Sequence, residues 1–383
     1  MKAATDMTGR SGRLPKRSEN GQKSNGTKQS NRKKIQPLAK LHCEENQTVL
    51  EGVTKPCILI ETPEKGVAMD CDEPAHPPTD PLVSPLHHFG CRSFEDVWVK
   101  MVDKEQNHRH SKSFLQNHPN LEPGMRSILL DWLIEVSEAF TLHRQTFYLA
   151  QNYFDRFMLT QNNIEKSILQ LIGITCLFIA SKMEEACPPK VSQMAYVTAG
   201  TYYEEEILQM ELIVLKTLQW NLCSKTALSW LNVYFHMASM NATSDLLEPP
   251  HFPQEAYVVM TRLLDLCTLN IDSLDFQHRV LAASVLCHFI QQETIEKLSG
   301  LSKDVIQPCV SWMSPFVETV SRLGSVTLRE FAKEVKKEEK HNIQTHADYM
   351  TMLETAAQMA NSQFLSPPNS KENICTFSSV LLL

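Results

Sequence analysis

Residues 168–180 are Ile-Leu-Gln-Leu-Ile-Gly-Ile-Thr-Cys-Leu-Phe-Ile-Ala, a run that places apolar side chains on all sides of an α-helix. A helix without a polar face is buried on all sides, so it belongs at the centre of a bundle. The run is too short to cross a bilayer, which takes about 20 apolar residues. We therefore expect other helices to pack around this one.

Helical periodicity continues on both sides of this run, and no alternating pattern typical of strands appears. Pro188-Pro189 ends the central helix, and Thr201 with Glu204 predicts a capping box where the fifth helix begins. The pattern predicts two sets of five helices, at 125–140, 144–158, 164–185, 191–197 and 203–219, and at 226–238, 254–269, 278–291, 302–320 and 343–360. A short amphipathic helix, with Phe94, Val97, Trp98 and Met101 on one face, precedes them. The predicted class is all-α, with two tandem five-helix domains.

The segments outside these helices have a different composition. Residues 1–40 hold eleven Lys or Arg but only two acidic residues, Asp6 and Glu19. Such a tail is typical of a nuclear import signal, a solubilising segment or a nucleic-acid-binding arm. The predicted organisation is a disordered basic and proline-rich tail at 1–90, a helix and linker at 91–124, domains at 125–225 and 226–360, and a disordered tail at 361–383.

The composition also argues against several functions. The eleven cysteines include no Cys-x-x-Cys pair and no His/Cys cluster at zinc spacing, so we expect reduced thiols and no metal. No apolar core is present in residues 1–30, so we expect no secretory signal. No phosphate-binding glycine-rich loop or hydrolase motif appears, so we expect neither a cofactor nor an enzyme.

Residues 125–140 form a helix with an apolar arc of about 240°, far wider than a surface helix needs. Either neighbouring helices bury this arc, or one edge of it docks an external peptide. Arg126 falls inside the arc. Its guanidinium must either pair with a carboxylate, for which Asp155 is the candidate, or extend to solvent.

Three motifs resemble those of one family. Met125-Arg-Ser-Ile-Leu-Leu-Asp-Trp-Leu-Ile-Glu-Val136 is similar to the signature of the cyclin box. Ala180-Ser-Lys-Met-Glu-Glu185 and Met210-Glu-Leu-Ile-Val-Leu-Lys216 resemble two further cyclin motifs, in the same order. The stretches Phe154-Asp-Arg-Phe-Met-Leu-Thr-Gln161 and His341-Asn-Ile-Gln-Thr-His346 resemble the E-type cyclins in particular.

This resemblance implies a regulatory subunit that binds and activates a cyclin-dependent serine/threonine kinase, most specifically cyclin-dependent kinase 2, to drive entry into DNA replication. The residues it assigns to kinase contact are Lys182, Glu211 and Trp98. From the residues alone, Lys182 and Glu211 could equally form an ion pair within the bundle. The resemblance assigns Arg126 and Asp155 to a structural ion pair.

The resemblance also implies a docking patch for Arg-x-Leu peptides of substrates and Kip-type inhibitors. We define this docking patch by its seven assigned residues, Met125, Ile128, Leu129, Trp132, Glu135, Leu169 and Gln170. Glu135 would receive the basic residue of the peptide. The family most often has Ala where this chain has Ser127.

The tails resemble phosphodegrons of E-type cyclins. Ser366 and Ser370 would be phosphorylated and bound by an F-box ubiquitin ligase, and Thr62 lies in a weaker copy. Ser-Pro pairs also occur by chance in such tails. The expected location is the nucleus, from the basic tail, with the centrosome and cytoplasm as further sites. Ser229-Trp-Leu-Asn-Val233 is similar to a centrosome-targeting stretch, but Trp230 fits a core position of a helix at least as well.

The alternative is a double-cyclin-fold transcription factor that binds DNA. That function would need a zinc ribbon and a basic folded region. The cysteine spacing argues against the ribbon, and the acidic balance outside residues 1–40 argues against a basic folded region. We therefore expect no direct contact with nucleic acid, and no association with a membrane.

Overall fold

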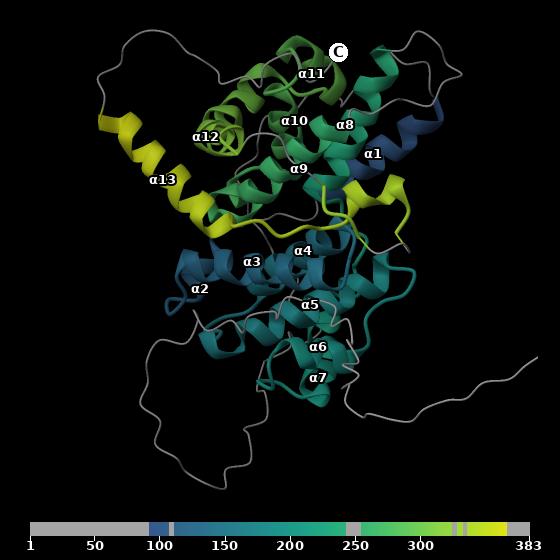
Figure 1. The fold of residues 1–383 in the computed structure, drawn as a ribbon, viewed down its shortest axis with the longest axis vertical. Helices are drawn as coiled ribbons and strands as arrows, with labels where there is room; N and C mark the ends of the chain where they lie inside the picture. Colours follow the sequence, from purple (N-terminus) through teal and green to yellow (C-terminus); the bar gives the residue numbers. More distant parts are fainter. Residues whose placement is uncertain (1–91, 107–110, 243–253, 324–327, 332–334, 366–383) are drawn as a thin grey trace, which may run out of the picture. The chain divides into compact units, whose positions relative to one another are not determined.

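The protein is described by a computed structural model that covers residues 92–106, 111–242, 254–323, 328–331 and 335–365. Within these ranges every regular element is a helix, and the only strand-like feature is a single antiparallel bridge between His143 and Ile343 (Figure 1). The expected all-α class is confirmed.

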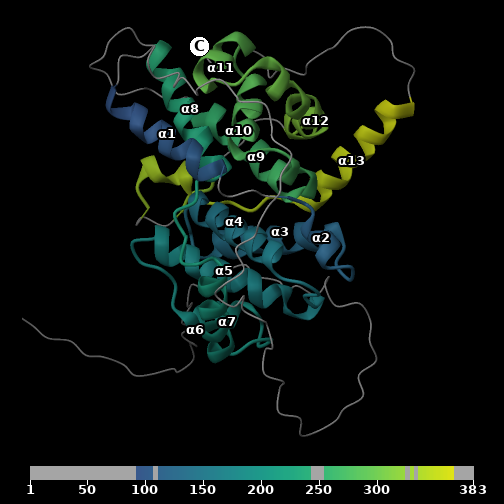
Figure 2. The same ribbon diagram turned by 180° about the vertical axis from the view of Figure 1, so that it is seen from behind.

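The first set of helices surrounds α5, the apolar helix with which the sequence analysis began (Figure 2). α5 contacts the four other helices of its set, as predicted, and Leu169 to Ser181 are all buried. The elements in this part of the sequence are α1 (Arg92–Gln106), α2 (Phe114–Asn117), α3 (Pro123–Ala139), α4 (Arg144–Thr160), η3 (Lys166–Ile168), α5 (Leu169–Glu184), α6 (Val191–Val197) and α7 (Glu204–Thr217). Of these, α1 does not surround α5 but lies beside the helix at Ala227–Ala242 (Figure 1).

A glycine sets how closely α3 approaches α5. A Cβ atom added to Gly173 would lie 2.8 Å from Cδ1 of Leu129, closer than side chains normally pack. The missing side chain therefore leaves room for Leu129, which is completely buried.

The second set surrounds α10, in which every residue except Arg279 is buried. α10 contacts α8, α9, α11 and α12. The elements of this half are α8 (Ala227–Ala242), α9 (Gln254–Leu269), η4 (Ile271–Asp275), α10 (His278–Cys287), α11 (Gln292–Ser299), α12 (Lys303–Ser321), η5 (Lys337–Asn342) and α13 (Tyr349–Leu365).

Two parts of the second set differ from the prediction. The helix expected at 278–291 ends at Cys287, and α11 follows as a separate element that ends at Ser299 and is capped by Gly300, where φ is +65°. The helix expected at 343–360 begins only at Tyr349 and is a sixth helix, which packs against α12, α9 and α3. The sequence did not separate α11 from the helix before it, because no proline or glycine lies between Cys287 and Gln292 to indicate a break.

The capping box of α7 also lies two residues later than expected. Glu206, not Glu204, accepts the hydrogen bond from the N-terminal cap, through the backbone N–H of Tyr203 at 2.8 Å. The hydroxyl of Thr201 instead donates to the carbonyl of Thr198.

Among the described residues, the segment Lys166–Glu184 is long and apolar enough to cross a membrane by length and composition. Most of it is buried inside the structure.

Candidate functional site

The first candidate site lies where the C-terminal end of α5 meets α7. Lys182 and Glu211 are in contact there through Nζ and Oε1, and the Lys182 side chain keeps 39% of its exposure while Glu211 keeps 12%. The end of a helix favours a cation, because its last carbonyl groups carry partial negative charge. The structure therefore brings together the two residues that the resemblance assigns to kinase contact, and it shows them paired within the chain.

Exposed apolar side chains flank this pair. Met183 follows Lys182 on α5. On α7, Leu208 lies three residues before Glu211, and Leu212 follows it directly. Trp220, just beyond α7, is 63% exposed. Exposed large apolar residues around a polar pair are typical of a surface that binds another protein. We call Lys182, Met183, Leu208, Glu211, Leu212 and Trp220 the α5–α7 surface.

Four of these residues, Met183, Leu208, Leu212 and Trp220, were not predicted from the sequence as part of a site. Leu208 and Leu212 are apolar residues on a helix, which usually indicates a core position. The available signal was the helical wheel of α7, on which Leu208 and Leu212 lie together on the side away from the buried Ile207, Met210 and Val214, and Glu211 lies at the boundary between the two sides.

Trp98 does not belong to this surface. Its side chain is 3% exposed, and its ring packs edge-on against Trp230 of α8, with the centroids 5.3 Å apart. Tyr234 lies beside both rings. We therefore assign Trp98 to the packing of α1 against α8, which corrects the expectation of kinase contact. Trp230, in the stretch that resembles a centrosome signal, is itself completely buried.

The docking patch lies on α3 and the start of α5, and its seven residues differ in exposure. Met125, Ile128 and Glu135 are partly exposed. The other four are buried and form the layer beneath them, namely Leu129, Trp132, Leu169 and Gln170. The close approach of α3 to α5 covers the second group, so only three of the seven assigned residues reach the surface.

Trp132 carries an unusual polar atom. Its indole Nε1–H is buried and has no hydrogen-bond acceptor among the described residues. A buried donor without a partner is destabilising, although other buried side chains in this structure, such as Trp230, also carry one. The nitrogen is therefore a candidate donor to a ligand.

Arg126 and Asp155 form a bidentate ion pair. Nε lies 2.7 Å from Oδ1 and Nη2 lies 2.8 Å from Oδ2, and both side chains are almost completely buried. Nη1 of Arg126 donates to the carbonyl of Thr268 at 2.9 Å, which ties α3 to the end of α9. The neighbouring hydroxyl of Ser127 donates to the carbonyl of Leu269 at 2.8 Å. The Ser127 departure from the family pattern therefore adds a second link between the two helical sets.

A second buried ion pair, which the sequence did not predict, joins Arg144 of α4 to Asp265 of α9. Asp265 also accepts hydrogen bonds from the hydroxyls of Tyr148 at 2.9 Å and Tyr349 at 3.0 Å, and from the amide of Gln344 at 3.3 Å. Burial alone would lower the pKa of Arg144, but the Asp265 carboxylate raises it above its usual value. Gln344 belongs to the stretch 341–346, which resembles E-type cyclins. Its hydrogen bond to Asp265 places this stretch at the junction of the two sets of helices.

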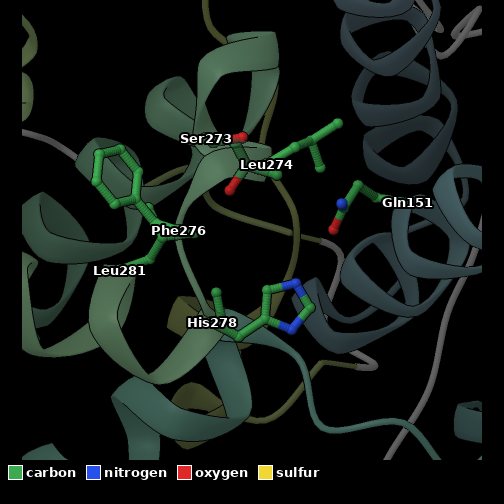
Figure 3. A pocket seen from close by; sticks show the side chains of 8 residues that line it. Gln151, Ser273, Leu274, Phe276, His278 and Leu281 are labelled. Atoms are coloured by element: carbon green, nitrogen blue, oxygen red, sulfur yellow. The ribbon is translucent and has the colours of Figure 1, made fainter. Parts of the chain in front are cut away.

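A small cavity lies at the same junction (Figure 3). It holds about 10 Å³, room for roughly one water molecule, so it cannot take a substrate. Gln151 extends into it from α4, opposite His278 of α10 and Leu274 of η4. Among the described residues, no group of three or more His, Cys, Asp or Glu side chains is arranged to hold a metal ion. The degron residues Thr62, Ser366 and Ser370 lie outside the described residues.

Comparison with known families and proteins agrees with this geometry. Residues 96–223 match the family model of the cyclin N-terminal domain, and residues 225–349 match that of the cyclin C-terminal domain. The chain is 46% identical over 317 residues to a G1/S-specific cyclin-E1 from Gallus gallus, which covers 82% of this chain and 77% of that one. It is 44% identical over 312 residues to the protein of the same name from Danio rerio, which covers 79% and 75%.

A solved structure shares the fold. The crystal structure of a viral cyclin from herpesvirus saimiri superposes with a TM-score of 0.50 at 21% identity, covering 58% of this chain and 97% of that one. Two matching domain models span most of the described helices, and relatives more than 40% identical cover most of the chain. The chain therefore belongs to the cyclin family, and within it to the E-type cyclins.

Proposed function

We propose that this chain binds a cyclin-dependent serine/threonine kinase through the α5–α7 surface and activates it for entry into DNA replication. The observation that carries the proposal is the Lys182–Glu211 pair set among exposed apolar side chains. The apolar residues supply buried area on association, and the pair supplies polar contacts that fix the orientation of the partner. A cyclin that holds the αC helix of a kinase keeps its glutamate paired with the lysine that positions ATP.

Cyclin-dependent kinase 2 is the specific partner that we propose. Purified chain should bind this kinase and raise its activity on histone substrate. Lys182→Glu places two acidic groups together in the α5–α7 surface, so kinase affinity should fall at least about tenfold, as expected for a central interface residue. Lys303→Glu, an exposed lysine on α12, serves as the matched control and should leave affinity unchanged. If wild-type chain binds no kinase, or binds one that stays inactive, the proposal is wrong.

We further propose that the docking patch binds Arg-x-Leu segments of substrates and of Kip-type inhibitors. Partly exposed Met125 and Ile128 would contact the apolar residue of the peptide, and Glu135 would attract its basic residue. The buried indole N–H of Trp132 would donate to the peptide backbone. The proposal is supported by the position of these groups, since the apolar side chains, the Glu135 carboxylate and the Trp132 N–H all lie on α3.

Two substitutions, one at the partly exposed Met125 and one at the buried Trp132, test the docking patch. Met125→Ala removes exposed apolar area, and Trp132→Phe keeps a ring but removes the N–H group. Together they should weaken binding of an Arg-x-Leu peptide at least about tenfold, since each removes an interaction of about 1 kcal/mol. Kinase activation measured on a substrate without this motif should persist. Met350→Ala on α13 is the control, and unchanged peptide affinity in the double variant would remove the assignment.

We also propose that an F-box ubiquitin ligase recognises this chain after phosphorylation of Ser366 and Ser370, with Thr62 as a secondary site. The proposal is supported by the sequence, in which Pro367 follows Ser366. Two phosphates would offer charge-assisted hydrogen bonds to an arginine-lined pocket. Ser366→Ala should lengthen the half-life of the protein in dividing cells, measured after a block of synthesis. Ser378→Ala is the control, and an unchanged half-life for Ser366→Ala would count against the degron.

A further inference from the structure

The ammonium group of Lys182 contacts an aromatic ring on α5 as well as Glu211. Nζ of Lys182 lies 4.2 Å from the centroid of the Phe178 ring, one helical turn earlier. The ring is 6% exposed and packed into the core, so its position is fixed. The ammonium group is thus bound by the face of a buried aromatic ring and by a largely buried carboxylate.

This arrangement is uncommon for a lysine at a surface. A lysine side chain has four rotatable carbons and normally adopts many rotamers, and holding it in one of them costs conformational entropy. The aromatic face attracts the cation electrostatically, and the carboxylate does so directly. Both attractions act in the isolated chain, so the entropy of Lys182 is already lost before any partner binds.

We propose that Phe178 and Glu211 are positioning residues, which preorganise Lys182 for contact with the kinase. This inference rests on the proposed function, because it assigns a role to Glu211 within the α5–α7 surface and to Phe178 beneath it. Phe178 itself touches no partner. It acts through Lys182, and its second role is to fill the core beside α7.

A double-mutant cycle separates the two roles of Phe178. Phe178→Leu keeps an apolar side chain but removes the ring, and should weaken kinase binding about two- to fivefold, the range of an exposed cation–π contact. In a Lys182→Met background the same substitution should have no further effect. Phe178→Tyr keeps the ring and should restore the affinity. Equal losses in both backgrounds would show that Phe178 acts only through packing, and would overturn the inference.

An observation on the isolated chain distinguishes this inference from the proposed function. The ring should shift the NMR signals of the Lys182 ε-methylene protons to high field, and Phe178→Leu should abolish that shift. A wild-type spectrum without the shift would overturn the positioning role even if the kinase binds. A wild-type chain that shows the shift but binds no kinase would overturn the proposed function and, with it, the purpose assigned to Phe178.

Discussion

Replacing Arg126 with Met is expected to lower the free energy of unfolding by about 3–5 kcal/mol. The substitution leaves the Asp155 carboxylate buried without its cation, and it also removes the hydrogen bond to the carbonyl of Thr268. An uncompensated charge in the protein interior is far more costly than the loss of the pair as a whole. Urea denaturation followed by circular dichroism measures the effect.

Two further variants check the cause. Arg322 is 61% exposed and pairs with Glu318 on the surface of α12, so Arg322→Met should change stability by no more than about 1 kcal/mol. Arg126→Met combined with Asp155→Leu removes both buried charges, and should lose less stability than Arg126→Met alone. A double variant that is less stable than the single one would contradict the ion-pair explanation.

Asp265→Ala should also lower the free energy of unfolding by about 3–5 kcal/mol. The carboxylate is the common acceptor for Arg144, Tyr148, Gln344 and Tyr349, so its removal leaves the buried Arg144 guanidinium without a counterion. Asp103→Ala, on the exposed side of α1, is the matched control and should have little effect.

Hydrogen exchange locates the damage in the Asp265 variant. The amides of residues 343–345 are fixed beside α3 and α4, where the N–H of Gln344 donates to the carbonyl of Leu142 at 2.9 Å. Losing the side-chain contact between Gln344 and Asp265 should speed exchange in this segment more than in α5. Equal acceleration throughout the described helices would show that Asp265 does not hold the segment in place.

Much of the fold could be predicted because the decisive signals are local. The all-apolar period of α5 predicted its central position, and prolines and turn residues predicted most helix ends. Arg126 was recognisable because a cation inside an apolar arc requires a partner. Arg144 gave no such signal, since it begins a helix among polar residues and its partner lies 121 residues away in the chain.

The candidate site was only partly predictable, because contacts between residues far apart in the chain leave no local signal in the sequence. The packing of the helices decides which side chains are exposed. It leaves Leu208 and Leu212 exposed, and it buries Trp98 and Leu129. A helical wheel shows which side chains share a face but not what covers that face. The roles of Lys182 and Glu211 came from motif resemblance rather than from periodicity.

The two buried ion pairs have a consequence for how the chain melts. Arg126 and Arg144 both reach from the first cyclin domain to α9 of the second, through a carbonyl in one case and a carboxylate in the other. If the second domain unfolded first, Arg144 would lose the Asp265 carboxylate. If the first domain unfolded first, the carbonyl of Thr268 would lose the guanidinium of Arg126. Both domains should therefore unfold together, as one cooperative transition in calorimetry. The sequence contains two cyclin boxes that can be recognised separately, but we expect the two boxes to fold and unfold as one unit.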